Sequence, residues 1–370
     1  MAIPQFKVYM SDDVDDYVLP VLHSGFIGQG QKVEEFESQL KTFLDLSSDR
    51  NLLTVNSATS GLMLALKLAG AKPGASVVST PMTCSATNEA IALMGAEIIW
   101  ADINEFGNID SESVLKKVRP DTVAVMAVDW GGLPCNYADL REALNYFDNN
   151  VYIIEDAAHA FGAEFRNTSV ANSGGDFVVF SFQAIKLLTT GDGGAVVTPA
   201  GDMYERAKLL RWYGLDRTKG DAMRSRQDIK EVGFKFHMND IAASIGLANL
   251  PHIEKLLAKH RSNAELYDII LPESCVIDLP HPYNGKSSDW FYTIKIKNPL
   301  DFEDWMKAKN IGVSQIHYRN DKYSVFSYAA TYLPALNDLF ETMCAIPCGW
   351  WLTEDDIFWI ADCVREYNRK

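Results

Sequence analysis

Between residues 51 and 197 the chain repeats one pattern, in which a short and nearly continuous apolar run is followed by a stretch with helical spacing. Runs of this kind, without polar alternation, are typical of strands buried on both faces. Strands joined by helices form a mostly parallel sheet covered on both sides. The sequence therefore predicts an α/β fold here, with strands expected at 52–55, 76–79, 97–100, 123–127, 151–154 and 177–180.

The pattern changes near residue 251. A long helical stretch, 238–267, is interrupted by Pro251, and residues beyond about 271 no longer alternate in the same way. A chain of 370 residues is long enough for a large core and a second lobe. We expect a large α/β domain over residues 1–250 and a smaller α+β domain over residues 251–370. The second domain's expected elements are a strand at 290–296 and helices at 301–309 and 354–367.

Charge and composition exclude several classes of protein. Lysine and arginine number 34 and acidic residues 49, so the net charge is 34 − 49 = −15, without a basic block that would suit a nucleic acid. No apolar run approaches membrane-spanning length, and the first residues lack a signal-peptide pattern. The six cysteines are scattered, which favours a reducing cytoplasm over a disulfide framework. Cys344 and Cys348 have no second Cys or His pair at finger spacing, so we expect no metal site.

Three segments follow expected strands and should meet at one edge of the sheet, because sites in parallel sheets lie at the carboxyl ends of strands. The first is the turn 56–61, which opens a helix. Its small residues Ser57 and Ala58 let the backbone approach a phosphate, the Thr59 hydroxyl can donate, and the helix N-terminus adds positive potential. Taken alone, the same letters also describe an ordinary helix cap.

The second and third segments bring titratable groups to the same edge. Asp156 ends a strand, where its carboxylate could keep a pyridinium nitrogen protonated, and His159 could bond the phenolic oxygen of such a ring. Lys186 lies in an apolar stretch, where desolvation favours the neutral amine that attacks aldehydes. Ser181 is a candidate phosphate ligand. Each residue has an ordinary structural reading, but their combination predicts a pyridoxal phosphate (PLP) site.

With these motifs the chain resembles the DegT/DnrJ/EryC1/StrS sugar aminotransferases, which are PLP enzymes of fold type I. The resemblance runs nearly end to end and implies a seven-stranded, mostly parallel sheet flanked by helices, with a smaller C-terminal α+β domain. The matching motifs are Ser24–Gly30 with Val33–Glu37, Glu155–His159, Ser181–Gly194 and Asn239–Leu247.

The family also implies the reaction. L-glutamate usually donates the amino group, the reaction passes through a Lys186 aldimine and pyridoxamine 5'-phosphate, and the kinetics are ping-pong. The acceptor is a 4-keto or 3-keto 6-deoxyhexose linked to dTDP, UDP or GDP, and we favour C4 because that class is common among relatives. Two alternatives stay open: a pyridoxamine phosphate-dependent 3-dehydratase, in which a histidine replaces the lysine, and a non-catalytic PLP-binding regulatory protein.

Further residue roles follow from the resemblance. It implies a homodimer with active sites at the interface, where the segment holding Lys235 reaches the partner's cofactor phosphate; many relatives have Asn there. Cys84 stands where relatives often place an aromatic residue over the PLP ring, and a thiol packs on a ring face less extensively than an aromatic side chain. Substrate-binding candidates in two loops and in a segment rich in cations and aromatic rings are Gly28, Gln29, Arg217, His317, Tyr318 and Arg319.

Overall fold

The computed structural model describes residues 2–147, 150–220, 223, 226–272, 275 and 285–370. The strands are β1 Arg50–Val55, β2 Ser76–Ser79, β3 Glu97–Trp100, β4 Thr122–Val128, β5 Tyr152–Asp156, β6 Glu164–Phe165, β7 Thr168–Ser169, β8 Phe177–Ser181, β9 Gly194–Pro199, β10 Tyr292–Lys295 and β11 Met343–Ile346. The α-helices are α1 Val14–Leu22, α2 Gln31–Phe43, α3 Ala58–Ala69, α4 Ser85–Leu93, α5 Ser111–Leu115, α6 Tyr137–Leu144, α7 Val170–Ser173, α8 Asp202–Leu210, α10 Asp240–Asn249, α11 Ile253–Ile270, α12 Pro299–Ala308, α13 Pro334–Phe340 and α14 Glu354–Asn368.

Seven strands form the central sheet, in the order β1-β9-β8-β5-β4-β2-β3. The pairs β2–β3, β2–β4, β4–β5 and β5–β8 are parallel, whereas β9 runs antiparallel to both of its neighbours, β1 and β8. All the residues of β2 and β8 are buried, as expected for strands covered on both faces. The predicted α/β fold with a mostly parallel sheet is therefore confirmed.

Helix α3 shows how the sequence places one edge of this sheet. Ser57 caps the helix by accepting a hydrogen bond from the Ser60 amide, and Gly70 ends it in the left-handed conformation with φ 92°. At Gly61 the helix lies close to the sheet: a Cβ there would stand 2.8 Å from Val179 Cγ1 and 2.9 Å from Val196 Cγ2. The turn before α3 is therefore held close to the ends of β8 and β9.

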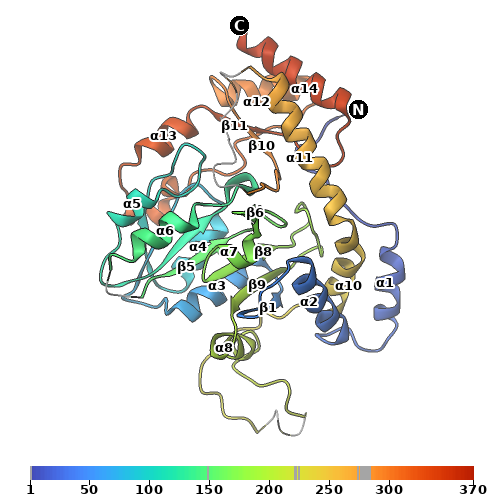
Figure 1. Ribbon diagram of the computed structural model, residues 1–370, viewed down its shortest axis with the longest axis vertical. Helices are drawn as coiled ribbons and strands as arrows, with labels where there is room; N and C mark the ends of the chain where they lie inside the picture. Colours follow the sequence, from blue (N-terminus) through green and yellow to red (C-terminus); the bar gives the residue numbers. More distant parts are fainter. Residues whose placement is uncertain (1, 148–149, 221–222, 224–225, 273–274, 276–284) are drawn as a thin grey trace.

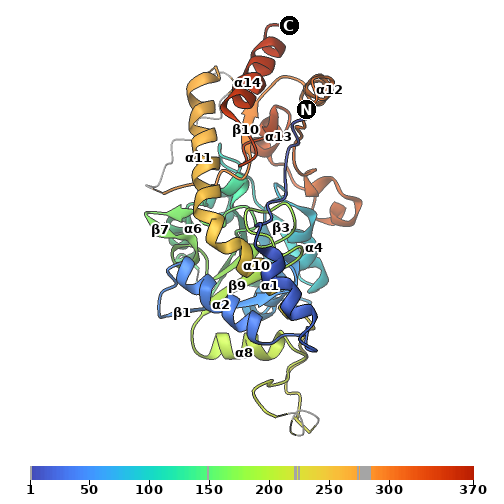
Figure 2. The ribbon, with the colours of Figure 1, turned by 90° about the vertical axis from the view of Figure 1, so that its right-hand side faces the viewer.

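The C-terminal part has its own small sheet, in which β10 pairs antiparallel with β11. Helices α11, α12 and α14 pack around it, and a separate apolar cluster that includes Tyr267, Ile294, Phe302 and Ile360 fills its interior. In both views the chain ends lie at this end of the molecule, and the N-terminal residues run from there down to α1, which packs against α10 (Figures 1 and 2). A backbone bridge between Ile3 and Ile311 ties the N-terminal residues to this part.

Most of the expected elements form close to their predicted bounds. The interrupted helix at 238–267 becomes α10 and α11, separated by a 3-10 turn, Leu250–His252, that contains Pro251. Strands β9 and β11 and helix α4 were not among the expected elements. None of the helices among the described residues is long and apolar enough to cross a membrane.

Candidate active site

Lys186 lies on the loop between β8 and β9, at the edge of the sheet where β5 and β8 end. Burial of the amine lowers the pKa of Lys186 to about 7, although the nearby Asp156 carboxylate and Cys84 act in the opposite direction. Its Nζ lies 3.4 Å from the centroid of the Trp290 ring. A large fraction of this amine is therefore neutral near pH 7, as a nucleophile requires.

Asp156 is the last residue of β5, and its carboxylate is fixed by two hydrogen bonds. Oδ1 accepts from the Ala158 amide at 3.1 Å, and Oδ2 accepts from the Thr87 hydroxyl at 2.7 Å. Thr87 in turn shares a hydrogen bond of 2.8 Å with the hydroxyl of Thr83. Burial raises the pKa of Asp156, and these two hydrogen bonds and Lys186 oppose that rise. Thr87 could not be predicted as part of the site from the sequence, because nothing local links α4 to the end of β5.

Two histidine rings lie beside Lys186. The rings of His159 and His317 are stacked, with centroids 5.8 Å apart and an interplanar angle of 18°. Burial lowers the pKa of His159 well below its usual value and that of His317 to about 4, so both rings are neutral at pH 7. Nδ1 of His159 and Nε2 of His317 are buried without a hydrogen-bond partner within the protein. Such orphaned atoms indicate a ligand, because buried polar groups are normally paired.

The turn at the start of α3 forms a close-fitting backbone surface. Gly194 lies so near that a Cβ there would stand 2.9 Å from the Ala58 amide nitrogen and 2.7 Å from the Phe180 carbonyl. Ser57, Ala58 and Thr59 are partly exposed at this turn, and Ser181 ends the neighbouring strand, β8. The exposed amides of a 12-residue helix can receive a phosphate. With Asp156, Lys186 and the orphaned imidazoles, this donor set fits PLP.

A second cluster surrounds Trp212 and holds the remaining cationic candidates. The Arg217 guanidinium lies 4.6 Å from the Trp212 ring centroid and donates to Gln29 at the side-chain oxygen (2.7 Å) and the carbonyl (3.0 Å). The exposed Lys235 lies 5.7 Å from the same ring. The chain after Lys235 pairs with the end of β1, where the Asn56 amide donates to the Phe236 carbonyl at 2.7 Å. This cluster therefore lies near the turn that begins α3.

The other candidates have different surroundings. The Gly28 carbonyl accepts a hydrogen bond from the Asp240 amide. Tyr318 is exposed, and its ring contacts that of Tyr323. The Arg319 guanidinium is buried and bonded to Asp321 at 2.8 and 2.7 Å and to Asn337 at 2.6 Å. Because this charge is already neutralised, the structure offers no support for a phosphate contact by Arg319.

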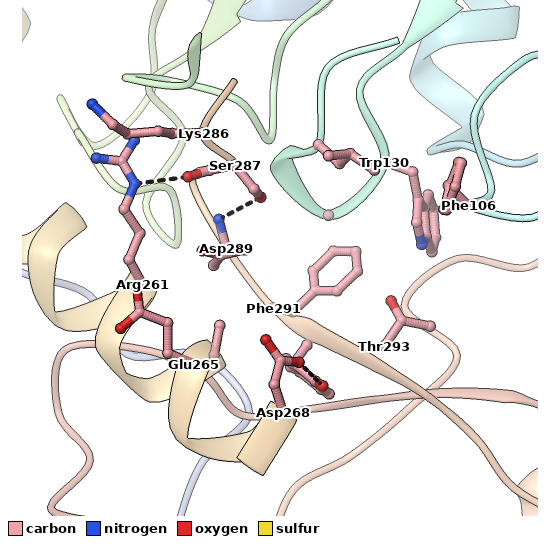
Figure 3. Close-up of a pocket in the computed structure, with 14 residues that line it drawn as sticks. Phe106, Trp130, Arg261, Glu265, Asp268, Lys286, Ser287, Asp289, Phe291 and Thr293 are labelled. Carbon is pink, nitrogen blue, oxygen red and sulfur yellow. Dashed lines mark hydrogen bonds between the residues drawn. The ribbon is translucent and has the colours of Figure 1, made fainter. Parts of the chain in front are cut away.

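A hollow of about 250 Å³ adjoins Trp130 and is lined on one side by α11 (Figure 3). Its wall residue Trp130 makes edge contacts with the rings of His159 at 5.9 Å and His317 at 6.1 Å. Arg261, Glu265 and Asp268 border the hollow from α11. None of the candidate site residues lines this hollow.

Among the described residues no group of three metal-binding side chains is found, and none of the six cysteines is joined by a disulfide. Cys344 lies in β11 and Cys348 just beyond it, as two thiols near a strand end.

The sheet, the Lys186 amine with its lowered pKa and the Asp156 carboxylate at the same edge are the features of a PLP-dependent aminotransferase. Residues 9–365 match the DegT/DnrJ/EryC1/StrS aminotransferase family, and the chain belongs to this family. The resemblance inferred from the motifs, the enzyme class and the cofactor are thereby confirmed.

Known proteins similar to this chain agree with that assignment. The crystal structure of AtS13 from Actinomadura melliaura is 38% identical, with a TM-score of 0.92 over 99% of this chain and 98% of that one. The sugar aminotransferase CalS13 from Micromonospora echinospora is 34% identical, with a TM-score of 0.90 over 98% and 99%. A UDP-4-amino-4,6-dideoxy-N-acetyl-beta-L-altrosamine transaminase from Helicobacter pylori is 29% identical over 90% of this chain and 88% of its own.

Proposed function

We propose that this enzyme transfers an amino group from L-glutamate to a nucleotide-linked keto-6-deoxyhexose, at C4 in preference to C3. The observation that carries the proposal is the partly buried Lys186 amine, with its lowered pKa, at the same sheet edge as Asp156. The name of the transaminase from Helicobacter pylori describes a UDP-linked 4-amino sugar. This supports an acceptor sugar linked to a nucleotide and transfer of the amino group to C4.

Each proposed cofactor contact has a structural basis. Lys186 would hold the aldehyde carbon, Asp156 the ring nitrogen and His159 the ring oxygen, whereas Ser57, Ala58, Thr59 and Ser181 would bind the phosphate. Cys84 caps α4 at this edge and would pack against the ring. When bound, PLP supplies a reactive aldehyde and a ring that withdraws electrons from the substrate carbon.

The protein's own groups would then move one proton. Once the substrate amine has replaced Lys186 at the cofactor, the Lys186 amine would be free to accept a proton from the substrate carbon. It would then return this proton to a neighbouring atom. The Thr87 and Ala158 hydrogen bonds favour the charged form of Asp156, because they oppose the rise that burial causes in its pKa. The neutral His159 and His317 rings add no charge that would compete with the Lys186 ammonium. Donor and acceptor use the same groups in turn, which gives ping-pong kinetics.

We propose that the acceptor's diphosphate binds to the cationic cluster around Trp212. The chain as a whole carries a charge of −15, so an anionic substrate needs a local group of cations. Arg217 and Lys235 supply the cations, with Gly28 and Gln29 in the adjoining loop, and His317 and Tyr318 would face the sugar. The division into domains 1–250 and 251–370 and the cytoplasmic location belong to this proposal.

A homodimer is part of the same proposal. Large apolar side chains are exposed around α1, namely Leu19, Leu22, Phe26 and Ile27, with exposed fractions of 47–55%. A second exposed pair, Ile229 and Val232, lies in the segment between α8 and α10. Apolar patches of this kind favour burial against another protein, and in a two-fold dimer each subunit offers the same surfaces.

The first experiment is an absorption spectrum of the purified protein with added PLP, before and after L-glutamate. A yellow band that bleaches with glutamate supports an amino-group transfer in which Lys186 binds the cofactor. The bleached enzyme is then offered 4-keto and 3-keto sugars linked to dTDP, UDP and GDP. Recovery of the band with a 3-keto sugar alone would contradict the proposed position, and a band unaffected by glutamate would contradict the donor.

A further inference from the structure

The Trp290 ring lies directly against the Lys186 amine, although it belongs to a residue more than one hundred positions further along the chain. The centroid of its ring is 3.4 Å from Nζ, and the side chain is only 3% exposed. It precedes β10, so the C-terminal part of the chain brings it to the edge of the large sheet. The proposed function assigns it no role.

Several contacts fix the Trp290 ring in this position. Its Nε1 donates to the Ile185 carbonyl at 3.1 Å, one residue before Lys186, and its backbone amide donates to the Gly131 carbonyl at 3.0 Å. Phe6 stacks on it with centroids 4.6 Å apart and an interplanar angle of 21°, and the His159 ring lies 4.4 Å away. The ring is therefore held by the same loop that carries the lysine.

An indole face attracts an ammonium group because its π electrons give it a negative potential, and the attraction grows where water is excluded. The charged and titratable groups that face the amine are Asp156, Cys84, His159 and His317. Burial disfavours the ammonium form, whereas Asp156 and Cys84 favour it. Trp290 adds a contact that favours the ammonium without contributing a second titratable group.

We propose that Trp290 is a further catalytic residue, whose indole face receives the Lys186 amine whenever that amine is not bonded to the cofactor and stabilises its protonated form. The proposal rests on the proposed role of Lys186. In the exchange Nζ gains one proton to become an ammonium and releases one proton on returning to the amine. The ring forms no bond and exchanges no electron, so it changes only how readily Nζ holds that proton.

The test uses the full-length protein without PLP. Competitive labelling with acetic anhydride at a series of pH values, followed by peptide mass spectrometry, gives the pKa of the Lys186 amine. We expect Trp290→Leu, which keeps apolar bulk but removes the ring, to lower this pKa by about one unit. Trp290→Phe, which keeps a smaller ring, should lower it less. An unchanged pKa overturns the proposal, and a raised one does so too, because it means that the ring acts by excluding water.

A second measurement keeps the shape of the site constant and so remains decisive if Trp290→Leu fails to fold. Wild-type protein grown with 5-fluorotryptophan, and then with a tetrafluorinated tryptophan, carries rings of the same outline with progressively weaker negative potential. The labelling pKa of Lys186 should fall stepwise with fluorine content. The same pKa at every fluorine content contradicts a contact through the ring face.

Two controls separate the contact from general effects. Phe6→Leu removes the ring that stacks on Trp290 without touching Lys186, and it should leave the labelling pKa within about 0.3 units. In folded Trp290→Leu protein, fluorination of the other tryptophans should cause no further fall. Labelling in the absence of PLP does not depend on turnover. A protein that binds no PLP would therefore refute the proposed function, whereas the measured effect of Trp290 on the pKa of Lys186 would remain valid.

Discussion

At the level of single residues, sequence analysis brought together the groups whose positions follow from the strand ends. Asp156 ends β5, Ser181 ends β8 and Lys186 follows, so a parallel sheet was sufficient to bring them to one edge. Thr87 and Trp290 could not be predicted in the same way. The first reaches Asp156 because β2 and β5 lie on either side of β4, and the second arrives from beyond residue 250. Contacts of this kind depend on strand order and long-range packing, which no local pattern records.

We predict that Lys186→Ala abolishes both covalent attachment of PLP and transamination, because no other amine takes its place, while Asp156 still binds the ring. Borohydride reduction followed by peptide mass spectrometry measures the attachment. The matched control is Lys309→Ala, whose amine pairs with Glu366 at 3.0 Å in the C-terminal part. Turnover comparable to wild type in Lys186→Ala would remove this lysine from the mechanism.

Asp156→Asn and Thr87→Val should give graded losses of activity. The first removes the negative charge opposite the ring nitrogen and should lower kcat by orders of magnitude. The second keeps the side-chain shape but deletes the hydrogen bond to Oδ2, which favours the carboxylate, so it raises the pKa of Asp156. A loss of about tenfold is expected at pH 7, given the usual strength of a hydrogen bond to a charged group. Equal rates in wild type and Asp156→Asn would show that the cofactor lies elsewhere.

Asp129 and Glu155 are two further buried carboxyls, and their mutual interaction favours a proton on the pair. Asp129 Oδ2 and Glu155 Oε1 have no hydrogen-bond partner within the protein, and burial raises the pKa of Asp129 to about 6 and that of Glu155 well above its usual value. A pKa that is higher in the folded state stabilises the fold at low pH, and this stabilisation is lost as pH rises through the folded pKa.

The stability of wild type should therefore fall between about pH 4 and pH 6, by about 3 kcal/mol. Asp129→Asn should flatten this fall, because its amide keeps an acceptor for the Tyr137 hydroxyl and donates to Glu155 without titrating. Urea unfolding at several pH values measures the difference. A variant whose stability falls as steeply as that of wild type would show that Asp129 does not hold the proton.

At the level of elements, the fold could be predicted where one strand or helix carries its own pattern. The buried runs at β1, β2, β3, β4, β5 and β8 and the capped helix α3 were all expected from the sequence. Strand β9 was not predicted, because its residues, Gly194–Pro199, directly follow the glycine-rich end of the Ser181–Gly194 motif. Its antiparallel insertion between β1 and β8 is set by tertiary pairing.

The close approach of β9 to the start of α3 gives a prediction about that junction. Gly194→Ala places a Cβ against the Ala58 amide and the Phe180 carbonyl, both backbone atoms that cannot move aside cheaply. The turn should be displaced, with a loss of PLP affinity of at least tenfold and a loss of stability of about 1–3 kcal/mol. Fluorescence titration and urea unfolding measure the two. Gly220→Ala is the control, because a Cβ there meets nothing within 4 Å and should change neither.

At the scale of the whole molecule, the two sheets and the N-terminal arm combine to complete the site. Trp290, just before β10, lies against the Lys186 amine, and Phe6 of the N-terminal arm stacks on the Trp290 ring. The C-terminal part therefore contributes to the chemistry of the large sheet, and a fragment lacking it would lack the ring beside the amine. Lys235, in the cationic cluster around Trp212, belongs either to the active site of its own subunit or to that of the partner subunit, and the two arrangements can be told apart by experiment.

The proposed homodimer makes this question testable. If Lys235 reaches the partner's phosphate, each site takes Lys186 from one subunit and Lys235 from the other. Mixed dimers of Lys186→Ala with Lys235→Ala then contain one site with both defects and one intact site. Equal mixing gives half mixed dimers, so about a quarter of the wild-type PLP incorporation should return, measured by borohydride reduction at limiting PLP.

Each variant alone sets the baseline, and sedimentation must show particles of twice 41.3 kDa in every sample. Phe26→Glu places a charge in the exposed apolar patch near α1 and should shift the protein toward single subunits, with loss of the recovered incorporation. Dimers that form without any recovery would mean that Lys235 acts within its own chain or not on the phosphate at all. Recovery of PLP incorporation in a sample that contains no dimers would exclude a site shared between two subunits. Lys186 and Lys235 would then complement each other through a different assembly.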